Sequence, residues 1–221
     1  MRRYYSFTLP LLGLVFLGLI TGACGSKSPE DLPKYKKKFR AQIASFENQK
    51  QKADEQVEDG VSTLNNLQQA LENAKNVDSE FKAVYGKWEK VDKQVESLNK
   101  EYEGLKQDAE NLFGAMERQT AGLNDEKTRT ELNNALKTSR SSYEQTLSKT
   151  AAAIEQLRSL HGDAVDVIKA LEVAIAIGQI AEINTGLQNI ESKVANIMKE
   201  LNATVKESKD LYESRMGGIS G

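Results

Sequence analysis

Apolar side chains recur every three or four residues through most of this chain, and the longest such run lies near its middle. From Phe81 to Met116 the apolar positions alternate steps of three and four without interruption. This spacing is the heptad pattern, which keeps one stripe of a long helix, its seam, against a partner helix. The run consists of Phe81, Val84, Trp88, Val91, Val95, Leu98, Tyr102, Leu105, Ala109, Leu112 and Met116.

Three further segments show the same one-sided pattern. The first, from Phe39 to Leu71, has Lys50 and Gly60 at two seam positions, which weakens it. A segment from Leu132 to Leu171 is less regular, and the last, from Ile180 to Leu201, is regular again. Helices of this length span about 50 to 65 Å at 1.5 Å per residue. The pattern therefore predicts four helices, near residues 31–75, 78–122, 126–172 and 177–215.

Capping residues mark two of the three breaks between these helices. Asp78 or Ser79 offers an N-cap for the second helix, and residues 122–125 combine a glycine stop with two capping side chains. Only Gly178 marks the third break, so we place that bend near residues 173–178.

Short turns between one-sided helices favour burial of the seams within one chain. We therefore predict an all-α fold, a long antiparallel four-helix bundle or coiled coil. The alternative is an extended rod that covers its seams by self-association, and the regular seams keep a homo-oligomer open.

The first 23 residues have the three parts of a bacterial export signal. Arg2 and Arg3 form a basic start, and an apolar run from Phe7 to Ile20 follows. This run of about 14 residues is too short to span a bilayer, which needs roughly 20. The quartet Thr21-Gly22-Ala23-Cys24 resembles the bacterial lipobox, in which the cysteine becomes the lipid-modified first residue of the mature protein. We predict cleavage of residues 1–23 as a lipoprotein signal peptide.

Cys24 is the only cysteine, and we predict that it receives a lipid such as palmitate. Thr21 departs from the lipobox, which usually has leucine at that position. One alternative is an ordinary secretory signal with an unmodified thiol. Another is the twin-arginine route, although the residues after Arg3 do not extend that pattern.

The remaining chain divides by composition. All three prolines lie in the first 33 residues, so residues 24–33 are predicted to form a flexible, lipid-anchored tether. Residues 34–216 form the helical coiled-coil domain, and 217–221 a flexible tail. Cys24 is not followed by aspartate at the second position of the mature chain, which resembles the pattern sent to the outer membrane. We expect a location in the cell envelope facing the periplasm, at the outer membrane if the cell is Gram-negative.

Charge and motifs exclude several classes of function. Cleavage removes Arg2 and Arg3 from the 30 basic residues and leaves 28 against 32 acidic ones, a formal charge of −4, which argues against nucleic acid as a partner. The only histidine, His161, lies on the third seam and is interpreted as a partly buried packing residue. It lacks a second histidine or free thiol to complete a metal or general-base site. No phosphate loop or nucleophile elbow occurs. We expect no catalytic residue, no metal and no cofactor, and hence not an enzyme.

A basic cluster at the start of the first helix is a candidate for membrane-surface contact. Five cations lie within seven residues, close to the predicted lipid, where an anionic leaflet would attract them. A solvated helix end is the alternative. The cluster comprises Lys34, Lys36, Lys37, Lys38 and Arg40.

An apolar run over residues 170–181 is the second candidate. It contains Val173, Ile175 and Ile177 and is too short to span a membrane. It either forms an exposed apolar hairpin tip that enters a membrane or a turn buried at the end of the bundle, and we favour the buried turn.

The stretch from Phe81 to Met216 resembles a bacterial family catalogued only as a domain of unknown function. The resemblance lies in Phe-x-x-Val-Tyr and Trp-Glu within 81–89, Asn-Leu-Phe at 111–113, and Leu-Gln-Asn-Ile-Glu-Ser-Lys-Val at 187–194. It implies a helical, coiled-coil-rich envelope protein and supplies no functional residues.

These observations favour a lipid-anchored structural or interaction protein of the bacterial cell envelope. Its expected partners are the membrane, through the lipid, and an unknown envelope protein or wall component. The alternatives are a periplasmic chaperone or adaptor with helical arms, and a membrane-inserting helical protein that uses the apolar 170–181 hairpin.

Overall fold

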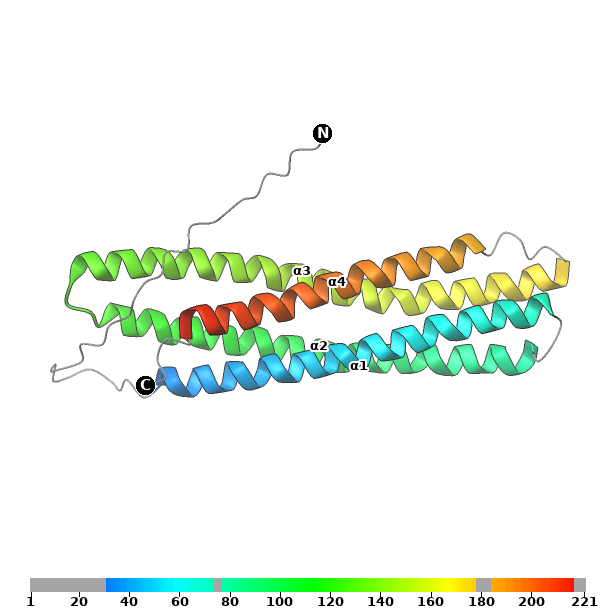
Figure 1. Ribbon diagram of the computed structural model, residues 1–221, viewed down its shortest axis with the longest axis horizontal. Helices are drawn as coiled ribbons and strands as arrows, with labels where there is room; N and C mark the ends of the chain where they lie inside the picture. Colours follow the sequence, from blue (N-terminus) through cyan, green and yellow to red (C-terminus); the bar gives the residue numbers. More distant parts are fainter. Residues whose placement is uncertain (1–30, 74–76, 178–183, 217–221) are drawn as a thin grey trace, which may run out of the picture.

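The computed structural model describes residues 31–73, 77–177 and 184–216, which form four α-helices and contain no strand. Consecutive helices are antiparallel and lie side by side as one long bundle (Figure 1). The predicted all-α four-helix fold is confirmed. The helices are α1 (Asp31–Glu72), α2 (Val77–Ala121), α3 (Glu126–Ile177) and α4 (Asn184–Met216).

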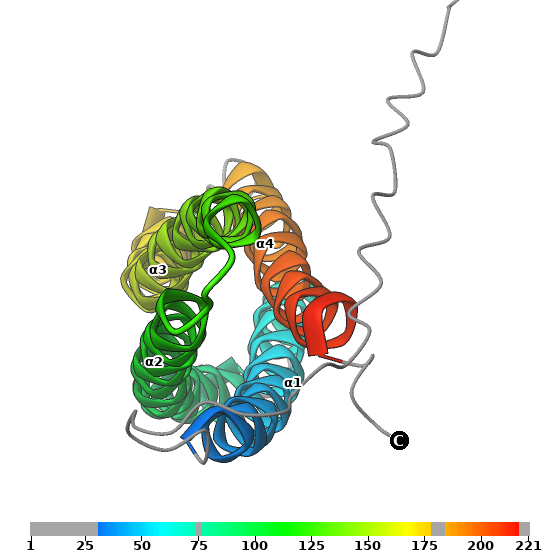
Figure 2. The ribbon, with the colours of Figure 1, turned by 90° about the vertical axis from the view of Figure 1, so that its left-hand side faces the viewer.

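Each helix packs against two neighbours, and the four follow one another around a ring. α1 contacts α2 and α4, and α3 contacts the same two helices (Figure 2). The start of α1, the α2–α3 turn and the end of α4 lie at one end, called here the tether end because α1 follows the predicted tether (Figure 1). The opposite end is called the far end.

The seams predicted from the sequence form the core. Every seam residue from Val84 to Leu112 is at most 6% exposed. Among the described residues, Tyr85 and Val173 are the large apolar side chains that remain exposed. Because the four seams face one another within one chain, self-association through the seams would require the bundle to open.

The two irregular positions on the seam of α1 have a structural explanation. Gly60 lies against the indole of Trp88, and a Cβ atom at position 60 would come within 3.1 Å of a ring carbon. The side chain of Lys50 is 11% exposed, and its Nζ lies 3.4 Å from a carboxylate oxygen of Asp54. Gly60 therefore makes room for the largest side chain of the core instead of weakening the seam.

The prediction for the third break is wrong. α3 continues as a helix through Ile177, so the expected helix end at 172, the bend near 173–178 and the start of the last helix at 177 are all misplaced. No glycine or proline interrupts residues 173–177, and the helix continues accordingly. The connection to α4, which begins at Asn184, and with it Gly178, falls outside the described residues.

The turn between α2 and α3 matches the prediction. A carboxylate oxygen of Asp125 accepts the backbone N–H of Thr128 at 2.7 Å, which is the geometry of an N-cap. The hydrogen bonds with Thr128 are the main cause of the lowered pKa of Asp125. The predicted second helix, 78–122, agrees with α2 within one residue at each end, and α1 ends at Glu72, three residues before the predicted 75.

Candidate functional site

The structure divides the basic cluster of α1 into two parts. Lys34, Lys37 and Lys38 are exposed and make no ion pair with any described residue. Lys36 is half-buried, and this burial lowers its pKa. The guanidinium of Arg40 lies over the ring of Tyr212 in α4, 5.7 Å from its centroid. The five cations therefore do not form one surface, because Arg40 is engaged in a contact between helices.

Three sequence-predicted features lie partly or wholly outside the described residues. Cys24 and the export signal precede α1 and are not described. Val173 is 61% exposed near the end of α3, whereas Ile175 and Ile177 are described only as helical backbone. No described helix is long and apolar enough to cross a bilayer. Lipid attachment and an apolar tip therefore stay predictions.

His161 is half-buried on α3, as predicted from its position on the seam. It contributes weakly to the lowered pKa of Glu89, whose main cause is the hydrogen bond from Lys93. In the described ranges, no three His, Cys, Asp or Glu side chains are grouped so that they could hold a metal ion.

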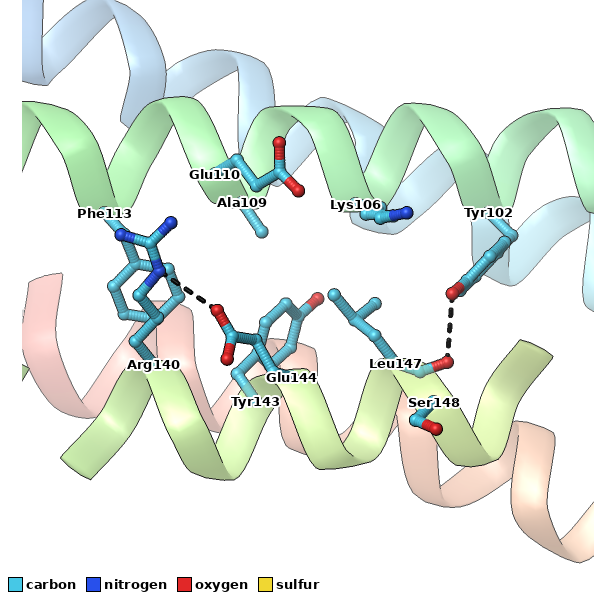
Figure 3. Close-up of a pocket in the computed structure, with 10 residues that line it drawn as sticks. All are labelled: Tyr102, Lys106, Ala109, Glu110, Phe113, Arg140, Tyr143, Glu144, Leu147 and Ser148. Atoms are coloured by element: carbon cyan, nitrogen blue, oxygen red, sulfur yellow. Dashed lines mark hydrogen bonds and ion pairs between the residues drawn. The ribbon is translucent and has the colours of Figure 1, made fainter. Parts of the chain in front are cut away.

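A groove of about 320 Å³ runs between α2 and α3, on the half of the bundle nearer the tether end (Figure 3). Its lining includes the apolar residues Ala109, Phe113 and Leu147. Charged side chains of both signs also line it, namely Lys106, Glu110, Arg140 and Glu144. Ala109 is the smallest seam residue of α2, and this is the only hint of the groove in the sequence.

Two interactions between α2 and α3 bound the groove along its length. The hydroxyl of Tyr102 donates a hydrogen bond of 3.0 Å to the carbonyl oxygen of Leu147 (Figure 3). Farther along, Arg140 forms ion pairs with Glu117 at 3.0 Å and Glu144 at 3.1 Å. The Tyr102 hydrogen bond and the Arg140–Glu117 ion pair join the two helices at opposite ends of the groove, whereas the Arg140–Glu144 pair lies within α3 (Figure 3).

Tyr143 contacts all of the other three helices. Its ring lies edge-on to Phe39 of α1, with 6.0 Å between centroids, and 6.2 Å from the ring of Phe113 of α2. Its hydroxyl shares a 2.9 Å hydrogen bond with Ser208 of α4. Burial raises the pKa of Tyr143, so its phenol stays protonated at neutral pH. The sequence predicted Tyr143 only as a seam residue.

The contact between α3 and α4 contains a row of buried hydroxyls, called here the hydroxyl contact. The hydroxyls of Thr150 and Thr204 share a hydrogen bond, and Thr146 donates one to Glu207. Each threonine of the first pair also lies within hydrogen-bond distance of a carbonyl oxygen four residues earlier in its own helix. Because each hydroxyl has one proton, one of the two donates to the other threonine and the second donates to its own carbonyl. The buried members are Tyr143, Thr146, Thr150, Thr204 and Ser208. Such an arrangement can hold two helices in one alignment, but it contains no activated nucleophile.

The comparisons with known proteins place the chain in a family. A family model described as "Protein of unknown function (DUF2959)" matches residues 30–214. The chain belongs to the DUF2959 family. The match includes α1, so the DUF2959 unit is the whole bundle and extends beyond the stretch from Phe81 to Met216 on which the resemblance rested. No curated protein and no solved structure matches the chain.

Proposed function

We propose that this DUF2959 protein is a lipid-anchored structural or interaction protein of the bacterial cell envelope, and that it acts by binding and not by catalysis. The observation that supports the proposal most is the lipobox-like quartet that ends at Cys24, directly after an export signal. A signal of this kind serves to export the chain and attach it to a membrane surface. The bundle is then the part that the lipid holds in the envelope.

The position of α1 relative to Cys24 supports this arrangement. α1 begins at Asp31, seven residues after the cysteine. Even a fully extended chain of that length reaches only about 25 Å. A lipid on Cys24 would therefore keep the tether end of the bundle close to the leaflet. The far end, at the other end of helices about 65 Å long, would be free to meet a partner away from the attachment point.

The chemistry of the described residues favours binding over catalysis. In the groove, Arg140 is already paired with two carboxylates, and Tyr143 is kept protonated by burial. A general base needs a partner within hydrogen-bond reach and a pKa near the working pH. The groove instead combines aromatic and apolar residues with charged ones, the two kinds of residue that form the core and the rim of a protein interface.

The closed bundle favours a structural or interaction role over the chaperone alternative. A chaperone that holds clients with helical arms needs a continuous exposed apolar surface. Tyr85 and Val173, the large apolar side chains exposed among the described residues, lie on different helices. The membrane-inserting alternative depends on the 170–181 run and is left as a prediction.

Cys24→Ala tests the anchor. The full chain is expressed in bacterial cells that are grown with labelled palmitate, and membrane and soluble fractions are separated. We expect the unaltered chain in the membrane fraction with label, and the variant in the soluble fraction without label. Thr21→Leu, which restores the usual lipobox residue, serves as the matched control and should keep both label and membrane location. Unchanged labelling and distribution of Cys24→Ala would contradict the proposal.

A further inference from the structure

We propose that three lysines on the outer face of α1, Lys34, Lys37 and Lys38, form a docking surface for an anionic lipid leaflet, separate from the rest of the basic cluster. The inference deepens the proposed function and rests on it for the nearness of α1 to the membrane. It assigns the partner of the tether end, namely the charged surface of the leaflet itself.

The three lysines share one side of the helix. Lys37 and Lys38 follow Lys34 by three and four residues, so all three side chains lie on one face of about one helical turn. This face is turned away from the buried ring of Phe39. All three are exposed, and none is neutralised by a carboxylate among the described residues. Their charges are therefore available to an external anion.

The arrangement is unfavourable for the helix itself. The first turn of a helix is the positive end of its dipole, where lysine is disfavoured and acidic residues are preferred. The first ten residues of α1 nevertheless contain one acid, Asp31, and five cations, of which Lys34 lies in the first turn. Helix stability does not explain this composition, whereas attraction to a nearby anionic surface does.

Arg40 and Lys36 are excluded from the docking surface by their own contacts. The guanidinium of Arg40 is stacked on Tyr212, so Arg40 holds the end of α4 against α1. Lys36 is half-buried. Lys36 lies three residues before Phe39 and therefore toward the buried side of the helix. Arg40 lies three residues after Lys37, at the edge of the outer face, but its guanidinium is engaged with Tyr212, so its use by the leaflet would require that contact between α1 and α4 to loosen.

A lipid leaflet suits this surface better than other anionic partners. Near an anionic leaflet each lysine contributes on the order of a fivefold gain in partition, and a short tether keeps the surface within range. The α2–α3 turn, which lies beyond the start of α1 (Figure 1), has four acidic and three basic residues between 117 and 131. That turn offers no attraction of its own, so the side of α1 is the cationic surface at this end.

Vesicle sedimentation tests the inference without the lipid anchor. The chain from Cys24 to Gly221 with Cys24→Ser retains all four helices and has no thiol to modify. Vesicles contain either phosphatidylcholine alone or equal parts of phosphatidylcholine and phosphatidylglycerol. We expect binding to the anionic vesicles at low salt, its loss at high salt, and binding weaker by on the order of 100-fold for K34Q/K37Q/K38Q.

Two matched variants make the test specific. K82Q/K90Q/K100Q removes three exposed lysines from α2 and changes the net charge equally, and it should bind within about twofold of the reference chain. Arg40→Gln should also bind within about twofold, while amide exchange near Tyr212 becomes faster because α4 has lost its contact. Circular dichroism confirms that each variant is folded.

Several outcomes would overturn the inference. One is the absence of any preference for anionic vesicles. Another is an equal loss of binding for both triple variants. A third is a loss of binding for Arg40→Gln as large as that for a Lys37→Gln single variant measured beside it. Because residue 24 bears no lipid in this experiment, its result is independent of the fractionation of Cys24→Ala.

Discussion

The buried seam between α1 and α2 is largely apolar along its length, with hydrogen bonds such as those of Gln42 with Glu101 and of Gln94 with Gln49 beside it. The contact between α3 and α4, in contrast, also buries hydroxyls in its tether half. The seam of α2 is buried and apolar from Val84 to Leu112, and Gly60 and Lys50 are the exceptions on the seam of α1. α4 has only apolar core residues up to Leu201, and after it Thr204 and Ser208 share the core with Val205 and Leu211. The tether half of α4 is thus held by hydroxyls as well as by apolar side chains.

Apolar contacts and hydrogen bonds contribute differently, the first mainly to stability and the second mainly to the alignment of the helices. Burying a large apolar side chain contributes about 1.5–3 kcal/mol, whereas a typical hydrogen bond contributes about 1 kcal/mol net. Hydrogen bonds are directional, however, and only one sliding position of α4 on α3 pairs Thr150 with Thr204 and Tyr143 with Ser208. We infer that the α1–α2 contact supplies most of the stability and that the hydroxyl contact sets the alignment of α4.

The largest expected change in the free energy of unfolding is at the apolar seam between α1 and α2. Trp88 is fully buried against Gly60, and its indole N–H has no hydrogen-bond partner among the described atoms. Trp88→Ala should therefore lower the free energy of unfolding by about 4 kcal/mol through lost burial and a cavity. Urea denaturation followed by circular dichroism measures the change.

Tyr85→Ala, on the exposed side of α2, is the control and should lower the free energy of unfolding by about 0.5 kcal/mol or less. Similar losses for the two variants would show that α1 and α2 do not pack as described.

An intermediate effect is expected at Tyr143, where apolar and hydroxyl contacts meet. Tyr143→Phe keeps the ring contacts but removes the hydrogen bond with Ser208, at a cost of about 1–2 kcal/mol at neutral pH. Burial raises the pKa of Tyr143 in the folded state above the value of about 10 in the unfolded state, so the folded chain holds this proton more tightly. The stability contribution is then complete below about pH 10 and declines as the pH rises further.

The alkaline part of this prediction has its own measurement. Urea midpoints between pH 8 and pH 11 should fall less steeply for Tyr143→Phe than for the unaltered chain, so the difference between the two proteins narrows as the pH rises. Burial also raises the pKa of Tyr102, so part of the alkaline decline should persist in the variant. A constant difference across this range would contradict the burial of the Tyr143 hydroxyl.

The smallest effect is expected within the hydroxyl contact itself. Thr150→Val or Thr204→Val alone should cost about 1 kcal/mol, because the remaining hydroxyl loses a buried partner. The double variant places two valines of similar shape together and should be close to neutral. A double-mutant cycle by urea denaturation measures this coupling. Strictly additive losses would mean that the two hydroxyls act independently and do not align the helices as a pair.

The same hydroxyls explain where the sequence-based prediction succeeded and where it did not. The apolar spacing predicts the buried apolar residues of α1 and of α2 except Phe113 and Ala115, because apolar residues every three or four positions are a direct signature of a buried stripe. The apolar pattern of α3 is irregular because Ser139 and Thr150 occupy core positions. In the last helix the regular pattern likewise stops at Leu201, before Thr204 and Ser208, although the predicted helix end at 215 agrees with Met216 within one residue. A hydroxyl in the core is indistinguishable from a surface hydroxyl until its partner on another helix is known.

The third break was misplaced for a related reason. Gly178 is the nearest turn residue in the sequence, and the prediction ends the helix at residue 172, several residues before it. The residues from Val173 to Ile177 have no feature that stops a helix, so α3 runs on. Helix ends without a cap in the sequence depend on what the neighbouring helices cover, which periodicity cannot show.

The four helices could be inferred from the chain alone, because each depends on residues close together in sequence. Lipid attachment at Cys24 and the lack of a catalytic site stay predictions of the same local kind. Spacing along one helix decides which side chains share a face, and an export signal is a contiguous segment. The tertiary structure decided what depends on pairs of helices. It placed Arg40 on Tyr212 and left Lys34, Lys37 and Lys38 free. The packing of the helices also leaves the groove beside Ala109 and brings Thr150 within hydrogen-bond distance of Thr204. Residues more than forty positions apart come into contact only in the folded bundle, so the sequence around each residue does not show which partner it will contact.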